Sequence, residues 1–387
     1  MNKTRLAELR ATYRDGLLEN TLPFWIRHAV DHEYGGYLTG LDHDGLVIET
    51  DKGIWQQGRF AWLLGHLHNH LEPNPEWLEV AASGINFLRQ HGFDADGRMW
   101  FQVTRDGRPL RKRRYLYSEC FTIMALAEFA RAANDESAAR QAIDLYEFYR
   151  KTLTTPGALP PKFTETRPLK SIGVPMIEIG VCHVLRETLG YAAATASIDR
   201  AITEIANDFV KDELRVVMES VEPDGAISNH FDGRTLNPGH AIEAAWFIMR
   251  EGIERDRDDY KRLGCRMLDY MWERGWDAEY GGIFYFRDLH DLPVQEYWHD
   301  MKFWWPHNEA IIATLMAWKI TGNECYAAWH TLVHDWAYQH FPDPEHGEWF
   351  GYLHRDGSIS VRLKGNLWKG AFHLPRMQWT CWQLLED

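Results

Sequence analysis

The stretch Met301-Lys302-Phe303-Trp304-Trp305-Pro306-His307-Asn308-Glu309-Ala310 decides how the rest of the chain is organised. It places two tryptophans, a proline, a histidine and a glutamate directly before an apolar run that continues to Trp318. A proline is tolerated in the first turn of a helix, where its missing N–H would have no partner anyway. The stretch therefore predicts a helix over 306–321 with His307 and Glu309 at its start and its later turns buried.

The same stretch has a chemical meaning. Flat aromatic faces beside a hydrogen-bonding carboxylate suit a sugar, which has apolar C–H faces and polar edges. Trp305 is therefore a candidate wall of a sugar site, and His307 is a candidate polar contact to the sugar. The alternative is that the tryptophans only pack a core and that the polar pair caps the helix.

Composition narrows the class of protein. The 387 residues are 45% hydrophobic and 25% charged, which is an ordinary globular balance. The net charge of −14 disfavours a nucleic-acid partner. The sequence has neither an apolar secretory core at its N-terminus nor a stretch long enough to span a membrane. The five scattered cysteines form no Cys-x-x-Cys pair, so we expect reduced thiols and a cytoplasmic location.

Apolar periodicity and an internal repeat predict the fold. Between helices, the segments 31–37, 277–286 and 343–350 resemble one another, and each contains a glycine-rich turn after an aspartate. A recurring unit of helix, hairpin and helix indicates an internal repeat. We expect an all-α (α/α)6 barrel, a toroid of twelve helices with short β-hairpins between the pairs, as a single domain over 1–387. The predicted helices cover 5–32, 55–70, 76–90, 116–133, 136–153, 173–190, 195–213, 239–254, 257–274, 306–321, 323–340 and 369–385.

Polar groups recur near the starts of the helices that we expect to form the inner ring. His240 and Glu243 share one helix face, Arg59 opens the second helix, and His373 opens the last helix. A barrel would bring these groups and Glu309 to one mouth. Each of them alone would also fit a capping residue or a structural ion pair. The His/Glu pairs could supply metal ligands, but no zinc-type motif accompanies them, so we predict no metal site.

Six motifs together resemble the N-acylglucosamine 2-epimerase family over essentially the whole chain. The resemblance implies an (α/α)6 barrel that interconverts N-acetylglucosamine and N-acetylmannosamine without a metal or redox cofactor. Arg59, His240, Glu309 and His373 fall on positions that are essential in the family, and Glu243 is expected to partner His240. The motifs are Trp55-x-Gln57-Gly58-Arg59, Ser118-Glu119-Cys120-Phe121, Val174-Pro175-Met176, Asn237-Pro238-Gly239-His240-x-x-Glu243-Ala244, Lys302-x-Trp304-Trp305-Pro306-His307-x-Glu309-Ala310 and Lys369-Gly370-x-Phe372-His373-x-Pro375-Arg376.

This chemistry assigns roles to the catalytic candidates. Epimerisation removes a proton alpha to the open-chain aldehyde and returns one to the opposite face, so two acid/base groups should flank C2. Imidazole titrates near neutral pH, which makes His240 and His373 the expected opposed pair. Arg59 would stabilise the negative charge that develops on O1. Glu309 and Glu243 would orient the imidazoles or assist ring opening.

Further positions bear on specificity. We expect Met176 against the N-acyl group, Asn237 among the substrate-binding residues, and Arg376 on sugar hydroxyls, with a structural ion pair as the alternative for Arg376. The related isomerases of mannose and sulfoquinovose carry a histidine where this chain has Met176, which favours the epimerase.

Three other functions stay open at this point. They are an aldose–ketose isomerase on the same fold, a glycosidase that uses Glu243 and Glu309, and a non-catalytic sugar-binding protein. The resemblance also leaves open a nucleotide such as ATP as an effector and a homodimer as the assembly.

Overall fold

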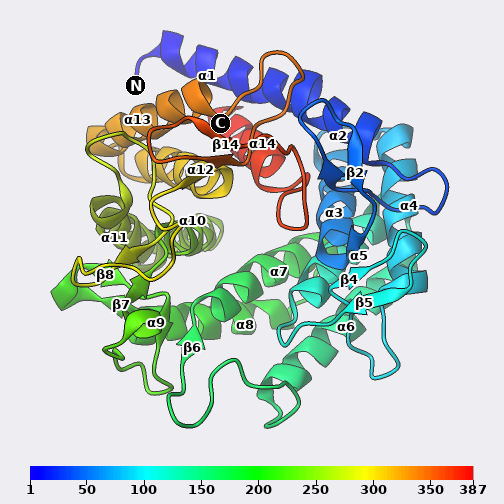
Figure 1. Cartoon of the computed structure of the whole chain (residues 1–387), viewed down its shortest axis with the longest axis horizontal. Coiled ribbons are helices and arrows are strands. Elements are labelled where there is room, and N and C mark those ends of the chain that lie inside the picture. The colour runs from blue at the N-terminus through cyan, green and yellow to red at the C-terminus, as the bar shows by residue number, and fades with distance from the viewer. Residues whose placement is uncertain (387) are drawn as a thin grey trace.

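Two concentric rings of helices make up the molecule (Figure 1). The computed structural model describes residues 1–386. Within them, each inner helix packs against the next, and the ring closes where Trp379 packs edge to face against His66 of the first inner helix. The inner ring consists of α3 (Ile54–His70), α5 (Tyr117–Ala133), α7 (Gly173–Leu189), α10 (Pro238–Glu254), α12 (Trp304–Thr321) and α14 (His373–Glu386).

The outer ring packs around the inner one and completes the predicted (α/α)6 barrel, whose fold class is thereby confirmed. Its first member consists of two consecutive helices that are joined by the π-helical turn Gly16–Thr21. A further short helix, α9 (Phe231–Arg234), lies between the pairs. The outer helices are α1 (Lys3–Asp15) with α2 (Leu22–Ala29), α4 (Pro75–His91), α6 (Glu136–Thr154), α8 (Ala193–Glu204), α11 (Asp258–Gly275) and α13 (Glu324–His340).

Burial distinguishes the two rings. In α12, every residue from Trp304 to Ala317 is buried, as expected for a helix that is surrounded on all sides. In the outer helix α6, burial is restricted to a stripe at helical spacing, including Ala138, Ala142 and Leu145. Apolar sequence all round thus selects the inner position, and amphipathic sequence selects the outer one.

Six small antiparallel sheets lie at one end of the barrel. Strands β3, β6, β10 and β12 each end within two residues of the start of an inner helix, so the sheets cover the end where the inner helices begin. The pairs are β1 (Gly40–Leu41) with β2 (Val47–Glu49), β6 (Lys170–Ser171) with β9 (Ser220–Val221), β7 (Val210–Lys211) with β8 (Val216–Val217), and β10 (Thr235–Leu236) with β11 (Arg287–Asp288). The three-stranded sheets are β3 (Lys52–Gly53), β4 (Gln102–Val103) and β5 (Pro109–Arg111), and β12 (Lys302–Phe303), β13 (Tyr352–Leu353) and β14 (Ile359–Val361).

The three similar segments of the sequence form the same turn. In each, one aspartate oxygen accepts two backbone N–H groups of the turn, and the carboxylate pairs with a buried lysine near the next inner helix. The turn needs left-handed backbone, which glycine supplies at Gly35, Gly36, Gly281, Gly282 and Gly347. The internal repeat is therefore present in three dimensions. The ion pairs are Lys52–Asp31 (2.8 Å), Lys302–Asp277 (3.0 Å) and Lys364–Asp343 (2.9 Å).

Several helix boundaries differ from the sequence prediction. The predicted helix 369–385 begins only at His373, as α14, and the predicted helix 5–32 is divided by the π-helical turn and ends at Ala29. The predicted helix 195–213 ends as α8 at Glu204, continues as a π-helical turn over Ile205–Phe209, and then becomes strand β7. Helix α12 begins at Trp304, two residues before the predicted start, because the extended Phe303 is its N-cap and Pro306 still lies within its first turn. Within residues 1–386, the helices are all too short or too polar to cross a membrane.

Candidate active site

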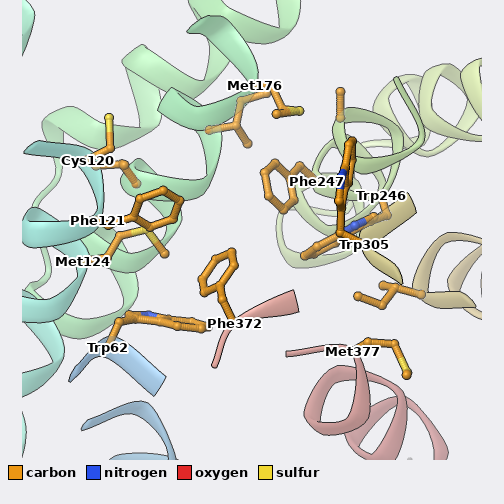
Figure 2. Packing of buried hydrophobic residues seen from close by; sticks show 14 of the residues in the cluster. Trp62, Cys120, Phe121, Met124, Met176, Trp246, Phe247, Trp305, Phe372 and Met377 are labelled. Atoms are coloured by element: carbon orange, nitrogen blue, oxygen red, sulfur yellow. The ribbon is translucent and has the colours of Figure 1, made fainter. Parts of the chain in front are cut away.

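A cavity of about 720 Å³ opens at the end of the barrel where the inner helices begin. Figure 2 shows aromatic rings and methionine side chains around this central space, among them Phe121, Met176, Phe247 and Trp305 from four inner helices and Phe372 from the residue before α14. The volume lies in the range of sites that enclose a small ligand. Five of the predicted polar residues also line the cavity, namely Arg59, His240, Glu243, His373 and Arg376.

His373 is the first residue of α14, and its imidazole is held by a buried carboxylate. Its Nδ1 lies 2.7 Å from Oε1 of Glu309. Glu309 also accepts hydrogen bonds from Nε1 of Trp246 (2.8 Å) and Nη2 of Arg376 (2.6 Å). Burial, followed by the charge of Arg376, lowers the pKa of His373 well below its usual value. His373 is therefore a neutral imidazole that donates Nδ1–H to Glu309 and has no proton on Nε2.

His240 lies in the first turn of α10 and has a different partner from the predicted one. Its Nδ1 is 3.0 and 3.2 Å from the two carboxylate oxygens of Glu219, which precedes β9. Burial favours a lower pKa for His240, but the charge and the hydrogen bond of Glu219 outweigh it and raise the pKa. The predicted pairing of His240 with Glu243 is wrong, because Glu243 accepts a hydrogen bond from Arg376 instead.

Trp305 links the two histidines. Its ring centroid is 5.1 Å from that of His240 and 5.7 Å from that of His373, with interplanar angles of 34° and 39°. Two imidazoles from distant parts of the chain thus stand against one indole at the wall of one cavity. Both imidazoles can therefore reach a ligand that occupies this cavity.

Arg59 lies in a box of aromatic rings. Its guanidinium carbon is 4.6 Å from the ring centroid of Trp55, 4.3 Å from that of Phe121 and 4.7 Å from that of Phe372. Within the described chain, its Nε has no hydrogen-bond partner and no carboxylate lies within 4.0 Å. Burial lowers the pKa of Arg59 to about 9, so the group is still a cation at neutral pH. A cation placed in this way can pair with an oxyanion of a ligand.

Arg376 is an ion-pair residue as well as part of the wall. Its Nη2 bridges Glu243 and Glu309, so one guanidinium group compensates two buried carboxylates. This contact realises the structural alternative that the sequence left open for Arg376. Both carboxylates converge on one nitrogen, and Glu309 is fully buried behind the cavity wall. Two catalytic carboxylates of a glycosidase would instead face the substrate from separate positions, so this geometry does not suit a glycosidase.

Two predicted substrate contacts lie outside the cavity lining. Nδ1 of His307 donates to the carbonyl of Phe303 (2.6 Å), and Nε2 accepts from the backbone N–H of Ile283 (2.9 Å). His307 is two residues from Glu309 and therefore points to a different side of α12. Asn237 is the N-cap of α10, and its side-chain oxygen accepts from the backbone N–H of His240 (3.2 Å). His307 thus supports the hairpin and Asn237 supports the helix that carries His240.

Sequence reasoning missed Glu219 altogether. It lies in a loop 21 residues before His240, where neither helical nor strand periodicity relates the two positions. The pairing of β6 with β9 brings it to the mouth of the barrel, because that pairing sets Ser171 opposite Ser220. The contact between Glu219 and His240 can therefore be recognised only from the folded structure.

Comparison with known proteins identifies the family to which the sequence and the fold belong. The profile of the N-acylglucosamine 2-epimerase (GlcNAc 2-epimerase) family matches residues 35–374. The N-acylglucosamine 2-epimerase of Bos taurus is 35% identical over 96% of this chain and 90% of its own length, and that of Homo sapiens is 32% identical over 95% and 88%. The solved cellobiose 2-epimerase of Bacillus thermoamylovorans B4167 shares the fold, with a TM-score of 0.84 over 100% of both chains at 20% identity. With its sequence, its barrel and its matched relatives in agreement, the chain belongs to the N-acylglucosamine 2-epimerase family.

Proposed function

We propose that this protein is an isomerase that interconverts N-acetyl-D-glucosamine and N-acetyl-D-mannosamine by proton exchange at C2 of the open-chain sugar. One observation carries the proposal: His240 and His373 stand against the same indole at one cavity, and their surroundings shift their pKa values in opposite directions, since Glu219 raises that of His240 whereas burial and Arg376 lower that of His373. The names of the matched relatives point to the same reaction.

The two imidazoles divide the chemistry between them. Neutral His373 takes the proton from C2, and the electron pair of the C–H bond moves into the C1–C2 bond, which leaves negative charge on O1. Protonated His240 then gives a proton to the other face of C2, and the carbonyl at C1 reforms. Environments that push two pKa values apart are what an acid and a base require. After one turnover His373 carries the proton and His240 lacks it, and exchange with solvent resets both groups.

Arg59 is proposed to stabilise the enolate. Its charge is fixed inside the aromatic box before the substrate arrives, so no reorganisation is needed as O1 becomes negative. Glu309 and Glu243 act through Arg376, and Glu309 also orients His373. These two carboxylates are therefore proposed as positioning residues.

The cavity wall provides a place for the acyl group. Met176, Ile177 and Gly180 of α7 line the cavity. Helix α7 lies across the ring from α14, which carries His373 (Figure 1). An apolar wall of this kind suits the methyl group of an N-acetyl substituent. Trp305 is proposed to contact a C–H face of the sugar ring.

The remaining proposals concern the whole protein. We infer one catalytic domain over 1–387, a reaction that requires no metal or redox cofactor, a small sugar as the only necessary partner, and a cytoplasmic location. A homodimer and an ATP-type effector are compatible with the family and are part of the same proposal.

Proton exchange in heavy water tests the function directly. The protein is incubated with N-acetylmannosamine in D2O, and C2 is followed by NMR. We expect N-acetylglucosamine that carries deuterium at C2. A sugar that keeps its C2 proton would contradict the proposal, and formation of fructose from mannose would instead support the aldose–ketose isomerase.

A further inference from the structure

The two histidines differ in how far the charge of the partner carboxylate is neutralised. Glu309, which holds His373, also accepts a hydrogen bond from Arg376. Glu219, which holds His240, has no lysine or arginine within 4.0 Å in the part of the chain that the structure describes. The negative charge of Glu219 is therefore directed at one imidazole, whereas the charge of Glu309 is shared.

Glu219 is fixed in place by its own strand pair. Its carbonyl accepts the backbone N–H of Ile172 (3.0 Å), and its Oε1 accepts the hydroxyl of Ser171 (3.4 Å). Both partners belong to the segment that leads into α7. Because β6 and β9 pair at this point, the backbone of Glu219 is held beside the start of α7, and Ser171 contacts its carboxylate. The contact therefore fixes the orientation of the ring.

Other charged and titratable groups also face this pair. Glu243, one turn after His240, adds negative charge, and Lys162 from the loop before β6 adds positive charge. The hydroxyls of Tyr117 and Tyr285 lie in the field of Glu219, and burial raises the pKa of both, so they are neutral. His373 lies beyond Trp305 and is also neutral. Among these groups, only Glu219 contacts the His240 ring as an anion.

We propose that Glu219 is the positioning residue that keeps His240 protonated and directs its Nε2–H into the cavity. The inference rests on the proposed epimerase function and deepens it. A carboxylate on Nδ1 fixes the tautomer and the direction of the second nitrogen, and it stabilises the imidazolium form. Without that charge, His240 would lose its proton at lower pH, and the enolate would have no acid on that face.

The loss of Glu219 therefore has a distinctive chemical consequence. His373 can still remove the C2 proton and return a solvent-derived one to the same face. From the other epimer, neutral His240 can remove the C2 proton and return a solvent-derived one to the same face. Because the equilibrium between the two sugars is unchanged, epimerisation slows in this direction as well. In both directions, isotope exchange at C2 continues while epimerisation slows. A purely structural defect would slow both processes together.

The experiment compares Glu219→Gln, Glu219→Asp and the wild-type protein. The matched control is Glu222→Gln. Glu222 lies in the same connecting segment between α8 and α10 but outside the cavity lining. For each protein and both sugars, NMR in D2O gives the ratio of exchange to epimerisation, and kcat is measured from pH 5.5 to 9. Thermal melting verifies the fold.

We expect Glu219→Gln to raise the ratio of exchange to epimerisation about tenfold or more and to move the alkaline limb of kcat to lower pH. Each unit by which the pKa of His240 falls costs about tenfold in kcat above that pKa. Glu219→Asp should lie between Glu219→Gln and wild type, and Glu222→Gln should match wild type. A Glu219→Gln protein with the wild-type ratio and the wild-type alkaline limb would overturn the proposal.

A second measurement holds even if Glu219→Gln does not fold. The His240 ring signal of the wild-type protein, assigned by its absence in His240→Ala, is titrated by NMR. A His240 pKa above 6.5 that falls in Glu219→Asp supports the proposal, and a pKa below 6.5 overturns it. If the wild type exchanges no proton at C2 of either sugar, the epimerase function fails, while this titration still reports on the pair.

Discussion

Oε1 of Glu309 lies 2.7 Å from Nδ1 of His373, and this contact joins two inner helices at the start of each. Glu309→Gln would keep the size of the side chain but leave Arg376 with one fewer anion and His373 without a charged partner. We expect kcat to fall about 10²-fold or more, with little change in KM, because the base loses its orientation. Steady-state kinetics would test this, and a kcat close to wild type would show that Glu309 serves only the fold.

Removal of either imidazole should stop epimerisation. We expect His240→Ala and His373→Ala each to lower kcat by at least about 10²-fold, the lower end of what general acid–base catalysis contributes. Product formation from both sugars measures this effect. His32→Ala, at an exposed position of the first hairpin, is the control and should match wild type. Full turnover in either cavity variant would remove that histidine from the mechanism.

The cation in the aromatic box should act on the rate rather than on binding. Arg59→Met places an apolar side chain among Trp55, Phe121 and Phe372, so we expect the variant to fold. Loss of one group that stabilises an oxyanion typically costs about 10²–10³-fold in kcat. The expected result is a large decrease in kcat with KM within a few fold of wild type. A change confined to KM would place Arg59 in ground-state binding instead.

A buried pair of histidines should make the protein sensitive to acid. Tyr13 hydrogen-bonds His330 (3.1 Å) and His334 (2.9 Å), and burial lowers their pKa values to about 4 and about 2. The folded-state pKa values lie below the unfolded value of about 6.5, so the unfolded chain binds more protons as the pH falls. Stability is therefore fully present above pH 6.5 and is lost below it. Two such groups give a slope of about 2.7 kcal/mol per pH unit near pH 5.

Urea unfolding at pH 7, 6 and 5 would measure this slope. In His334→Gln, which keeps a hydrogen-bonding partner for Tyr13, we expect the slope to decrease by about 1.4 kcal/mol per pH unit, the contribution of one such group. A slope that does not differ between the variant and wild type would assign the acid sensitivity to other groups.

The sequence predicts those parts of the site that depend on helix position. Arg59, His240 and His373 all lie near the start of an inner helix, and the internal repeat brings those starts to one end of the barrel. Directions within a turn are harder to predict. His307 and Glu309 were grouped by proximity in the sequence, but two residues of spacing on α12 send one side chain to the hairpin and the other to the interior.

Contacts made through the loops could not be predicted at all. Glu219 reaches His240 because strands β6 and β9, which belong to different connecting segments, pair with each other. No spacing in the sequence indicates that pairing. In the same way, Glu243 meets Arg376 across the barrel instead of meeting His240 one turn away. Charge compensation between distant helices decides such partnerships, and it depends on the closed ring.

The lysine–aspartate turns described above have a consequence for how the protein can change. The ion pairs of Lys52, Lys302 and Lys364 each anchor a glycine-rich turn to the end of the barrel where the inner helices begin. Segments next to these anchors supply wall residues such as Trp298, before Lys302, and Trp368, after Lys364. We therefore expect changes in these two segments to alter which sugars fit, while His240 and His373 keep their places at the starts of α10 and α14.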